Sequence, residues 1–118
     1  MTAETHLYRI LDADGTLAAL VDQRIYPDVI PQADELPAVV FSRTGTEPVQ
    51  TIHGPAVGAF AALQVQIWAR TRASAEAVAA AVVAALNASG ESYVARGALY
   101  DEETKTPGIA VDVSIFET

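Results

Sequence analysis

The chain has 118 residues, of which 15 are acidic and 7 basic, and its formal net charge is −8. This length predicts a single domain over residues 1–118. The sequence has no cysteine, which excludes disulfides and thiolate chemistry, and the acidic balance argues against nucleic-acid binding, which requires a basic stripe. No signal peptide and no membrane span are recognisable, so we expect a soluble protein made in a cytoplasm.

Two short amphipathic helices are predicted at the beginning of the chain. Apolar residues recur at the spacing of one helical face over residues 7–11 and again over residues 17–21. The pair Asp14 and Gly15 between them is a turn signal. Thr16 is then expected to cap the second helix.

A proline-rich connector, "RIYPDVIPQADELP" at residues 24–37, follows these helices. Each of Pro27, Pro31 and Pro37 fixes its own φ angle and disfavours helix at the residue before it. We therefore expect a stiff, extended segment whose apolar residues lie against the domain. The strand that follows, Ala38 to Arg43, is apolar on both faces, which predicts a central position in a sheet.

The middle of the chain is polar and rich in glycine, proline and threonine over residues 44–57. This composition predicts a long loop, and loops of this length are often functional. From Leu63 to Trp68 apolar and polar residues alternate, as they do in a half-buried strand. The alternation reaches back towards Val57, so we expect this strand to project beyond the sheet.

The last part of the chain predicts one helix and two strands. Ser74 is the expected N-cap of an alanine-rich helix that ends at Gly90. Strands are expected at 92–100 and 109–117, on either side of a charged turn. The order α-α-β-β-α-β-β predicts an α+β fold with an antiparallel sheet of about four strands and helices packed on one face.

Catalytic chemistry is not recognisable in the sequence. The two histidines, His6 and His53, stand apart from other ligand-type residues, and we interpret both as solvated side chains. Asp101, Glu102 and Glu103 cluster in the charged turn, where an exposed position would leave them untuned for acid–base catalysis. We expect no catalytic, cofactor or metal site, and no enzymatic activity.

Three segments in a fixed order resemble the small tail-completion, or tail-terminator, proteins of long-tailed bacteriophages and prophages. They are "DGTLAALV", "RIYPDVIPQADELPAVVF" and "LQVQIWARTRASAEAVAAAVVAAL", and the resemblance covers about residues 16–88. The matching residues are Leu17, Leu20, Val21, Arg24, Ile25, Tyr26, Pro27, Pro31, Leu36, Pro37, Val39, Val40, Val65, Gln66, Ile67, Trp68, Ala69, Ala75, Glu76 and Ala77.

The resemblance implies a structural protein of the virion. Proteins of this kind form a ring, commonly of six copies, that caps the head-proximal end of the tail tube, stops its polymerisation and presents a surface to the head connector. The implied partners are further copies of the chain, the tail tube protein and the head-completion or connector protein. DNA would pass through the lumen without specific binding, and assembly would take place in the bacterial cytoplasm.

A ring subunit would use the stiff connector as a rigid edge and residues 44–57 as contact elements, against a neighbouring subunit, the tube or the lumen. The candidate contact residues are Glu47, Val49, Gln50, Ile52 and His53. The alternative is a small dimeric α+β module that binds a ligand or a partner. A dimer with a preformed apolar pocket would favour that alternative, and a ring would favour the tail terminator.

Overall fold

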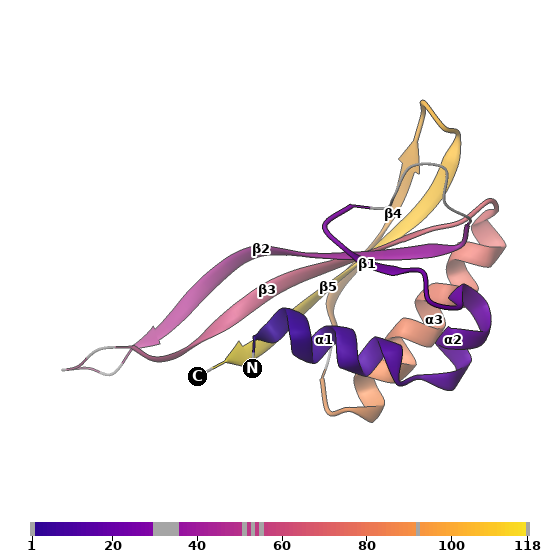
Figure 1. Ribbon diagram of the computed structural model, residues 1–118. Helices are drawn as coiled ribbons and strands as arrows, with labels where there is room; N and C mark the ends of the chain where they lie inside the picture. Colours follow the sequence, from indigo (N-terminus) through magenta and orange to yellow (C-terminus); the bar gives the residue numbers. More distant parts are fainter. Residues whose placement is uncertain are drawn as a thin grey trace.

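The computed structural model describes residues 2–29, 36–50, 52, 54, 56–91 and 93–117. In this part of the chain three helices lie on one face of a five-stranded sheet with the strand order β1-β2-β3-β5-β4 (Figure 1). The helices are α1 (Ala3–Asp12), α2 (Gly15–Val21) and α3 (Arg72–Ala88). The strands are β1 (Ile25–Pro27), β2 (Ala38–Gln50), β3 (Ala56–Trp68), β4 (Tyr93–Asp101) and β5 (Thr106–Glu117).

The predicted α+β class and the order of the elements are confirmed, but the sheet has one strand more than expected. The additional strand, β1, lies within the proline-rich connector and pairs in parallel with β2, so the sheet is mixed. The backbone N–H of Val39 donates to the carbonyl of Arg24 at 2.9 Å, and that of Asp28 donates to Phe41 at 2.9 Å. Proline keeps this segment extended, and extended backbone can pair with a neighbouring strand.

The connector is only partly packed against the rest of the molecule. The apolar residues of the connector were expected to lie against the domain. This is confirmed for Ile25, which is buried, and wrong for Val29, which is 72% exposed. Ile30 and Pro31 lie outside the described residues.

The core lies between the helices and the face of the sheet that they cover. Alternate residues of β3 and β5 point to this face, and the alanines of α3 allow the helix to approach the strands closely. The largest fully buried side chains are those of Leu7, Leu11, Leu17, Leu63, Ile67, Leu86, Ile109, Val21, Val39, Val65, Val78 and Val82. The regular alternation predicted from the sequence therefore reflects burial on one side of the sheet.

Two predicted helix caps were wrong by two or three residues. The N-cap of α2 is Asp14, whose side chain accepts from the backbone N–H of Leu17 at 3.0 Å. The N-cap of α3 is Thr71, which accepts from the N–H of Ser74 at 3.1 Å. Thr16 and Ser74 lie in the first turns of these helices, where the free N–H groups need an acceptor from an earlier residue.

The long loop predicted at residues 44–57 was wrong, because most of this segment is strand. β2 and β3 each have 13 residues and pair as a hairpin as far as Gln50 and Ala56. The prediction that the second of these strands reaches back to Val57 and projects is confirmed. The segment looks like a loop in the sequence because its side chains are solvated on both faces, which removes the alternation that marks a half-buried strand.

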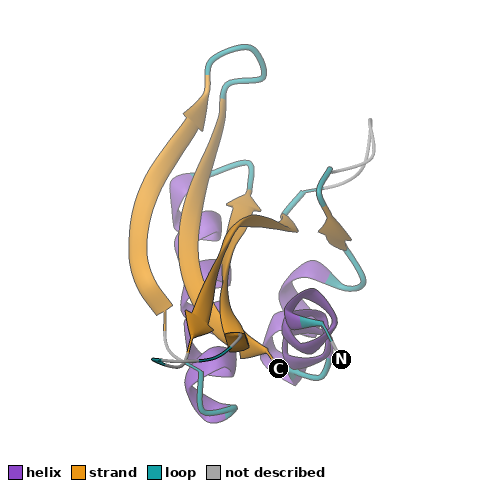
Figure 2. Cartoon of the chain, turned by 90° about the vertical axis from the view of Figure 1, so that its left-hand side faces the viewer, coloured by secondary structure: helices purple, strands orange, loops and turns teal. Residues whose placement is uncertain are grey.

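The outer half of this hairpin extends away from all three helices (Figure 1). We call it the arm: residues 44–50 and 56–62, with the tip residues Ile52 and Gly54. Figure 2, which views the molecule from the side toward which the arm points, shows the strong twist of the sheet between β4 and β1. Among the described residues, no helix combines the length and the hydropathy needed to cross a membrane.

Candidate assembly surfaces

The arm carries apolar side chains in solvent. Along β2 the residues change from buried, at Ala38–Phe41, to mostly exposed from Thr44 onward, with Val49 half-buried. Ile52 at the tip is 92% exposed, Val57 is 56% exposed and Phe60 is 44% exposed. Exposed apolar residues gathered on a projecting element are typical of a surface that becomes covered by a partner.

The base of the arm is stiffened by an aromatic pair on the face of the sheet away from the helices. The rings of Phe60 and Phe116 meet edge to face, with their centroids 5.3 Å apart. Gly58 leaves room for this pair, because a Cβ atom at that position would lie 2.5 Å from Cζ of Phe116 and 2.8 Å from the carbonyl oxygen of Glu117. The aromatic pair therefore ties the arm to the end of β5.

A second link at the base of the arm is ionic. Arg43 donates from Nη2 to Oε1 of Glu4 at 2.6 Å and from Nη1 to Oε1 of Glu117 at 2.7 Å. The backbone N–H of Ala3 donates to Oε2 of the same Glu117 at 2.9 Å. The hydrogen bonds from Arg43 lower the pKa of both carboxyl groups below their ordinary value of 4.5. We call Arg43, Glu4 and Glu117 the clamp; it joins α1, β5 and the base of the arm.

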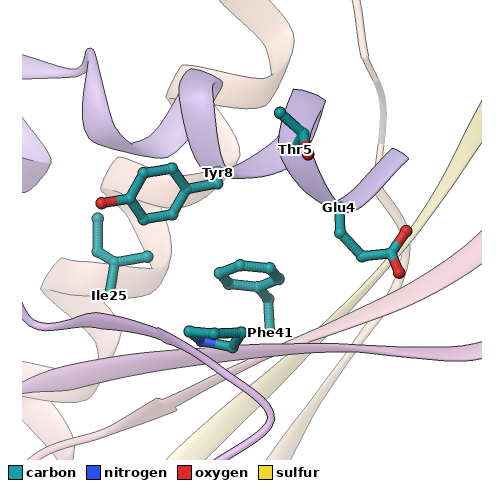
Figure 3. A pocket seen from close by; sticks show the side chains of 6 residues that line it. Glu4, Thr5, Tyr8, Ile25 and Phe41 are labelled. Carbon is teal, nitrogen blue, oxygen red and sulfur yellow. The ribbon is translucent and has the colours of Figure 1, made fainter. Parts of the chain in front are cut away.

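An apolar groove lies between α1 and the two strands β1 and β2. It has a volume of about 460 Å³, and Figure 3 shows it open beside the rings of Tyr8 and Phe41, whose centroids are 6.1 Å apart. Its lining residues are Glu4, Thr5, Tyr8, Ile25, Pro27 and Phe41. One clamp residue, Glu4, thus stands at the edge of the groove, while Arg43 is at the base of the arm.

The face of the sheet away from the helices carries a row of hydrogen-bonded polar side chains. Trp68 donates from Nε1 to Gln66 at 3.4 Å, Gln66 donates to Gln64 at 2.9 Å, and Gln64 donates to Asp112 at 3.2 Å. The indole ring of Trp68 lies over Gly108, where a Cβ atom would be 2.6 Å from the ring. These contacts hold the half-buried Trp68 flat on the sheet.

The contact residues predicted from the sequence lie on the arm where the structure describes them. Glu47, Val49 and Gln50 are in the outer half of β2, with Glu47 opposite Phe60 and Val49 opposite Gly58. Ile52 is at the tip, and His53 lies outside the described residues. Sequence reasoning missed the groove and the clamp, since both are formed by residues far apart in the chain.

The other histidine and the acidic turn considered in the sequence lie at the surface. Nε2 of His6 is 3.2 Å from Oε1 of Glu91, at the surface. Glu102 and Glu103 are exposed in the turn between β4 and β5. Among the described residues, no three or more histidine or carboxylate side chains gather in a way that could hold a metal ion.

The fold of this chain resembles that of a protein in a solved virion structure. A chain of the structure titled "Virion of native gene transfer agent (GTA) particle" is 25% identical in sequence and superposes with a TM-score of 0.79, over 93% of this chain and 90% of that chain. The chain is thus similar in fold to a protein in the virion of a gene transfer agent particle. No curated protein matches it significantly.

The family follows from the sequence as a whole. Residues 5–118 match the family described as "Tail completion protein gp17". The chain therefore belongs to this family of phage tail-completion proteins and is a structural protein of the virion tail. The resemblance noted in the sequence is confirmed, and it extends beyond residues 16–88 to the last two strands.

Proposed function

We propose that this protein is a tail terminator, a single-domain subunit whose copies close into a ring of six. The ring caps the head-proximal end of the tail tube, stops its polymerisation and joins it to the head connector. Membership of the tail-completion family supports this role. The observation that carries it is the arm, a projecting hairpin with apolar side chains that only an assembly would cover.

The arrangement of the arm suits a ring rather than a pair. The arm leaves the molecule at one end, so it meets a different surface of the next copy, and repeated head-to-tail contacts of this kind close into rings. The clamp and the aromatic pair fix the arm at its base, which keeps the angle between neighbours constant. The contact residues that we propose are Glu47, Val49, Gln50, Ile52 and His53.

The charges suit a channel for DNA that does not bind it. The chain carries a net charge of −8, and Arg24, Arg43, Arg72 and Arg96 form hydrogen bonds within the chain. Arg24 donates to the carbonyl of Pro37, and Arg72 donates to the carbonyls of Leu99 and Gly108. DNA would slide past such a surface by repulsion, without specific contacts. The role is structural and requires no catalytic group.

Growth of tail tubes in vitro tests this function. Tube protein is polymerised with and without the purified chain, and tube lengths are measured by electron microscopy. A terminator shortens the tubes in proportion to its concentration and leaves a cap at one end. Unchanged lengths and bare ends at a molar excess of the chain would contradict the proposal. Charge reversal at Asp101, Glu102 and Glu103 then tests a lumenal position, because DNA ejection should slow if this turn lines the channel.

One observation favours the alternative of a small ligand-binding dimer. The groove is preformed, and its volume of about 460 Å³ lies in the range of small-molecule sites. Stoichiometry separates the two functions. A binding module stays a dimer at every concentration and in the presence of tail tubes, whereas a terminator forms rings.

A further inference from the structure

We propose that the tip of the arm of one copy seats in the groove of the next copy, with Ile52 packing against the contacting rings of Tyr8 and Phe41. This inference rests on the proposed ring and specifies the contact that closes it. The occupant of the groove is thus a second copy of this chain.

The two surfaces match in chemistry and size. Ile52 has a branched apolar side chain that is 92% exposed, so removing it from water in a contact would be favourable. The groove offers apolar walls from Tyr8, Ile25, Pro27 and Phe41, and its volume of about 460 Å³ accommodates an isoleucine side chain together with backbone of the tip. An apolar knob and an apolar groove on the same chain are the two halves of one contact.

The arm cannot reach the groove of its own chain. Phe41 lines the groove and belongs to the same strand as the arm, and Gln50 lies nine positions further along β2. At about 3.3 Å per residue, this distance is roughly 30 Å. The hairpin points away from α1, which forms the other wall of the groove (Figure 1). Only another copy can supply the knob. The contact is head-to-tail when the arm of that second copy enters the groove of a third copy, whereas a mutual exchange between two copies would give a closed dimer.

The charge distribution favours this contact between identical acidic chains. Two copies that each carry −8 repel one another, so the contact is favoured where charge is lowest. Between residues 44 and 62 the sequence holds a single acidic residue, Glu47, and no lysine or arginine. At the groove, Glu4 is paired with Arg43 at 2.6 Å, which compensates its charge.

The clamp gives each copy a fixed relation between its knob and its groove. Arg43 directly precedes the arm in β2 and binds Glu4 at the edge of the groove, while its second carboxylate partner, Glu117, ends β5. The orientation of the arm is therefore set against the same helix that forms the groove. Repeating one fixed orientation from copy to copy is what closes a ring of defined size.

Cysteine crosslinking tests the contact directly, because the natural chain contains no cysteine. The double variant Ile52→Cys with Tyr8→Cys is assembled on tail tubes and oxidised, and the products are separated under non-reducing denaturing conditions. Two matched controls are Ile52→Cys alone and Ile52→Cys with Tyr100→Cys, since Tyr100 is an exposed tyrosine on β4. Thr5→Cys, at the rim of the groove, replaces Tyr8→Cys if the latter changes the fold.

The expected result is a ladder of covalent oligomers that ends at the closed ring, for the groove variants only. Annuli visible by electron microscopy without such a ladder would overturn this inference and leave the ring proposal standing. Dimers of the Ile52→Cys variant alone would overturn it too, because they indicate a symmetric tip-to-tip contact. A crosslink from the tip to the tube protein would reassign the arm to that partner. If no annuli form, the ring proposal and this inference both fail.

Discussion

Gly108 is the position at which the structure makes its most quantitative prediction. In the substitution Gly108→Ala, the new Cβ atom would lie 2.6 Å from Cε3 of Trp68 and 2.8 Å from the carbonyl oxygen of Ile67, against an ordinary contact distance of 3.4 Å or more. The indole ring can move, but the carbonyl belongs to the backbone of β3 in the middle of the sheet. The strands must therefore separate or the ring must leave the sheet.

Overpacking of this kind costs about 1–3 kcal/mol. For a chain of this length each kcal/mol lowers the melting temperature by about 4 °C, so we expect a decrease of roughly 4–12 °C. Trp68 is the single tryptophan of the chain, and its displacement from Gly108 should shift its fluorescence emission to longer wavelength. Gly97→Ala is the matched control, because a Cβ atom there meets nothing within 4 Å.

Thermal unfolding followed by circular dichroism, at one protein concentration, measures the effect for both variants. The Gly97→Ala variant should change the free energy of unfolding by no more than about 0.5 kcal/mol. If Gly108→Ala melts at the same temperature as Gly97→Ala and keeps the emission maximum of the natural chain, the packing of Trp68 described above is wrong.

Three further predictions concern the arm, the clamp and the core. Ile52→Asp should leave the melting temperature of the subunit unchanged, because the side chain is exposed, but each contact between copies should lose about 2 kcal/mol. Mass photometry should then show half-assembly of one contact at a roughly 30-fold higher protein concentration. An unchanged concentration would contradict this prediction. Arg43→Met should lower the free energy of unfolding above about pH 4.5, where Glu4 and Glu117 are ionised in the unfolded chain. The difference in free energy from the natural chain should vanish as the pH falls through the lowered pKa values of these two carboxyl groups. A difference that persists at pH 2 in urea titrations would exclude an electrostatic origin. Leu86→Ala should cost about 2–5 kcal/mol by opening a cavity, since Leu86 is fully buried; chemical denaturation with a loss below 1 kcal/mol would place this residue outside the core.

The regular parts of the fold could be predicted from the sequence because one-sided burial leaves a periodic pattern. The spacing of Leu7 and Leu11 predicted α1, and the alternation from Leu63 to Trp68 predicted the inner half of β3. The alanine-rich α3 was recognisable from its composition, although its cap was misplaced. The helices and these strands all border the same core, which fixes both their positions and their patterns.

The elements that were not predicted from the sequence lack a periodic pattern of apolar residues. The described residues between 44 and 57 are mostly exposed, so this part of the arm lacks the alternation of apolar and polar residues that marks a half-buried strand. β1 has only three residues, which is too short for an alternation to be read. The clamp joins Arg43 to Glu4 and Glu117, and these pairs are 39 and 74 positions apart. Such long-range ionic pairs and the groove beside them become visible only when the chain is folded.

The central claim is that copies of this chain close into a ring through their arms. Electron microscopy of the purified protein, alone and mixed with tail tubes, tests it most directly. We predict annular particles of uniform diameter, free in solution or seated at one end of each tube, and few or none for Ile52→Asp at the same protein concentration. Particles that remain single subunits or dimers under both conditions would contradict the claim.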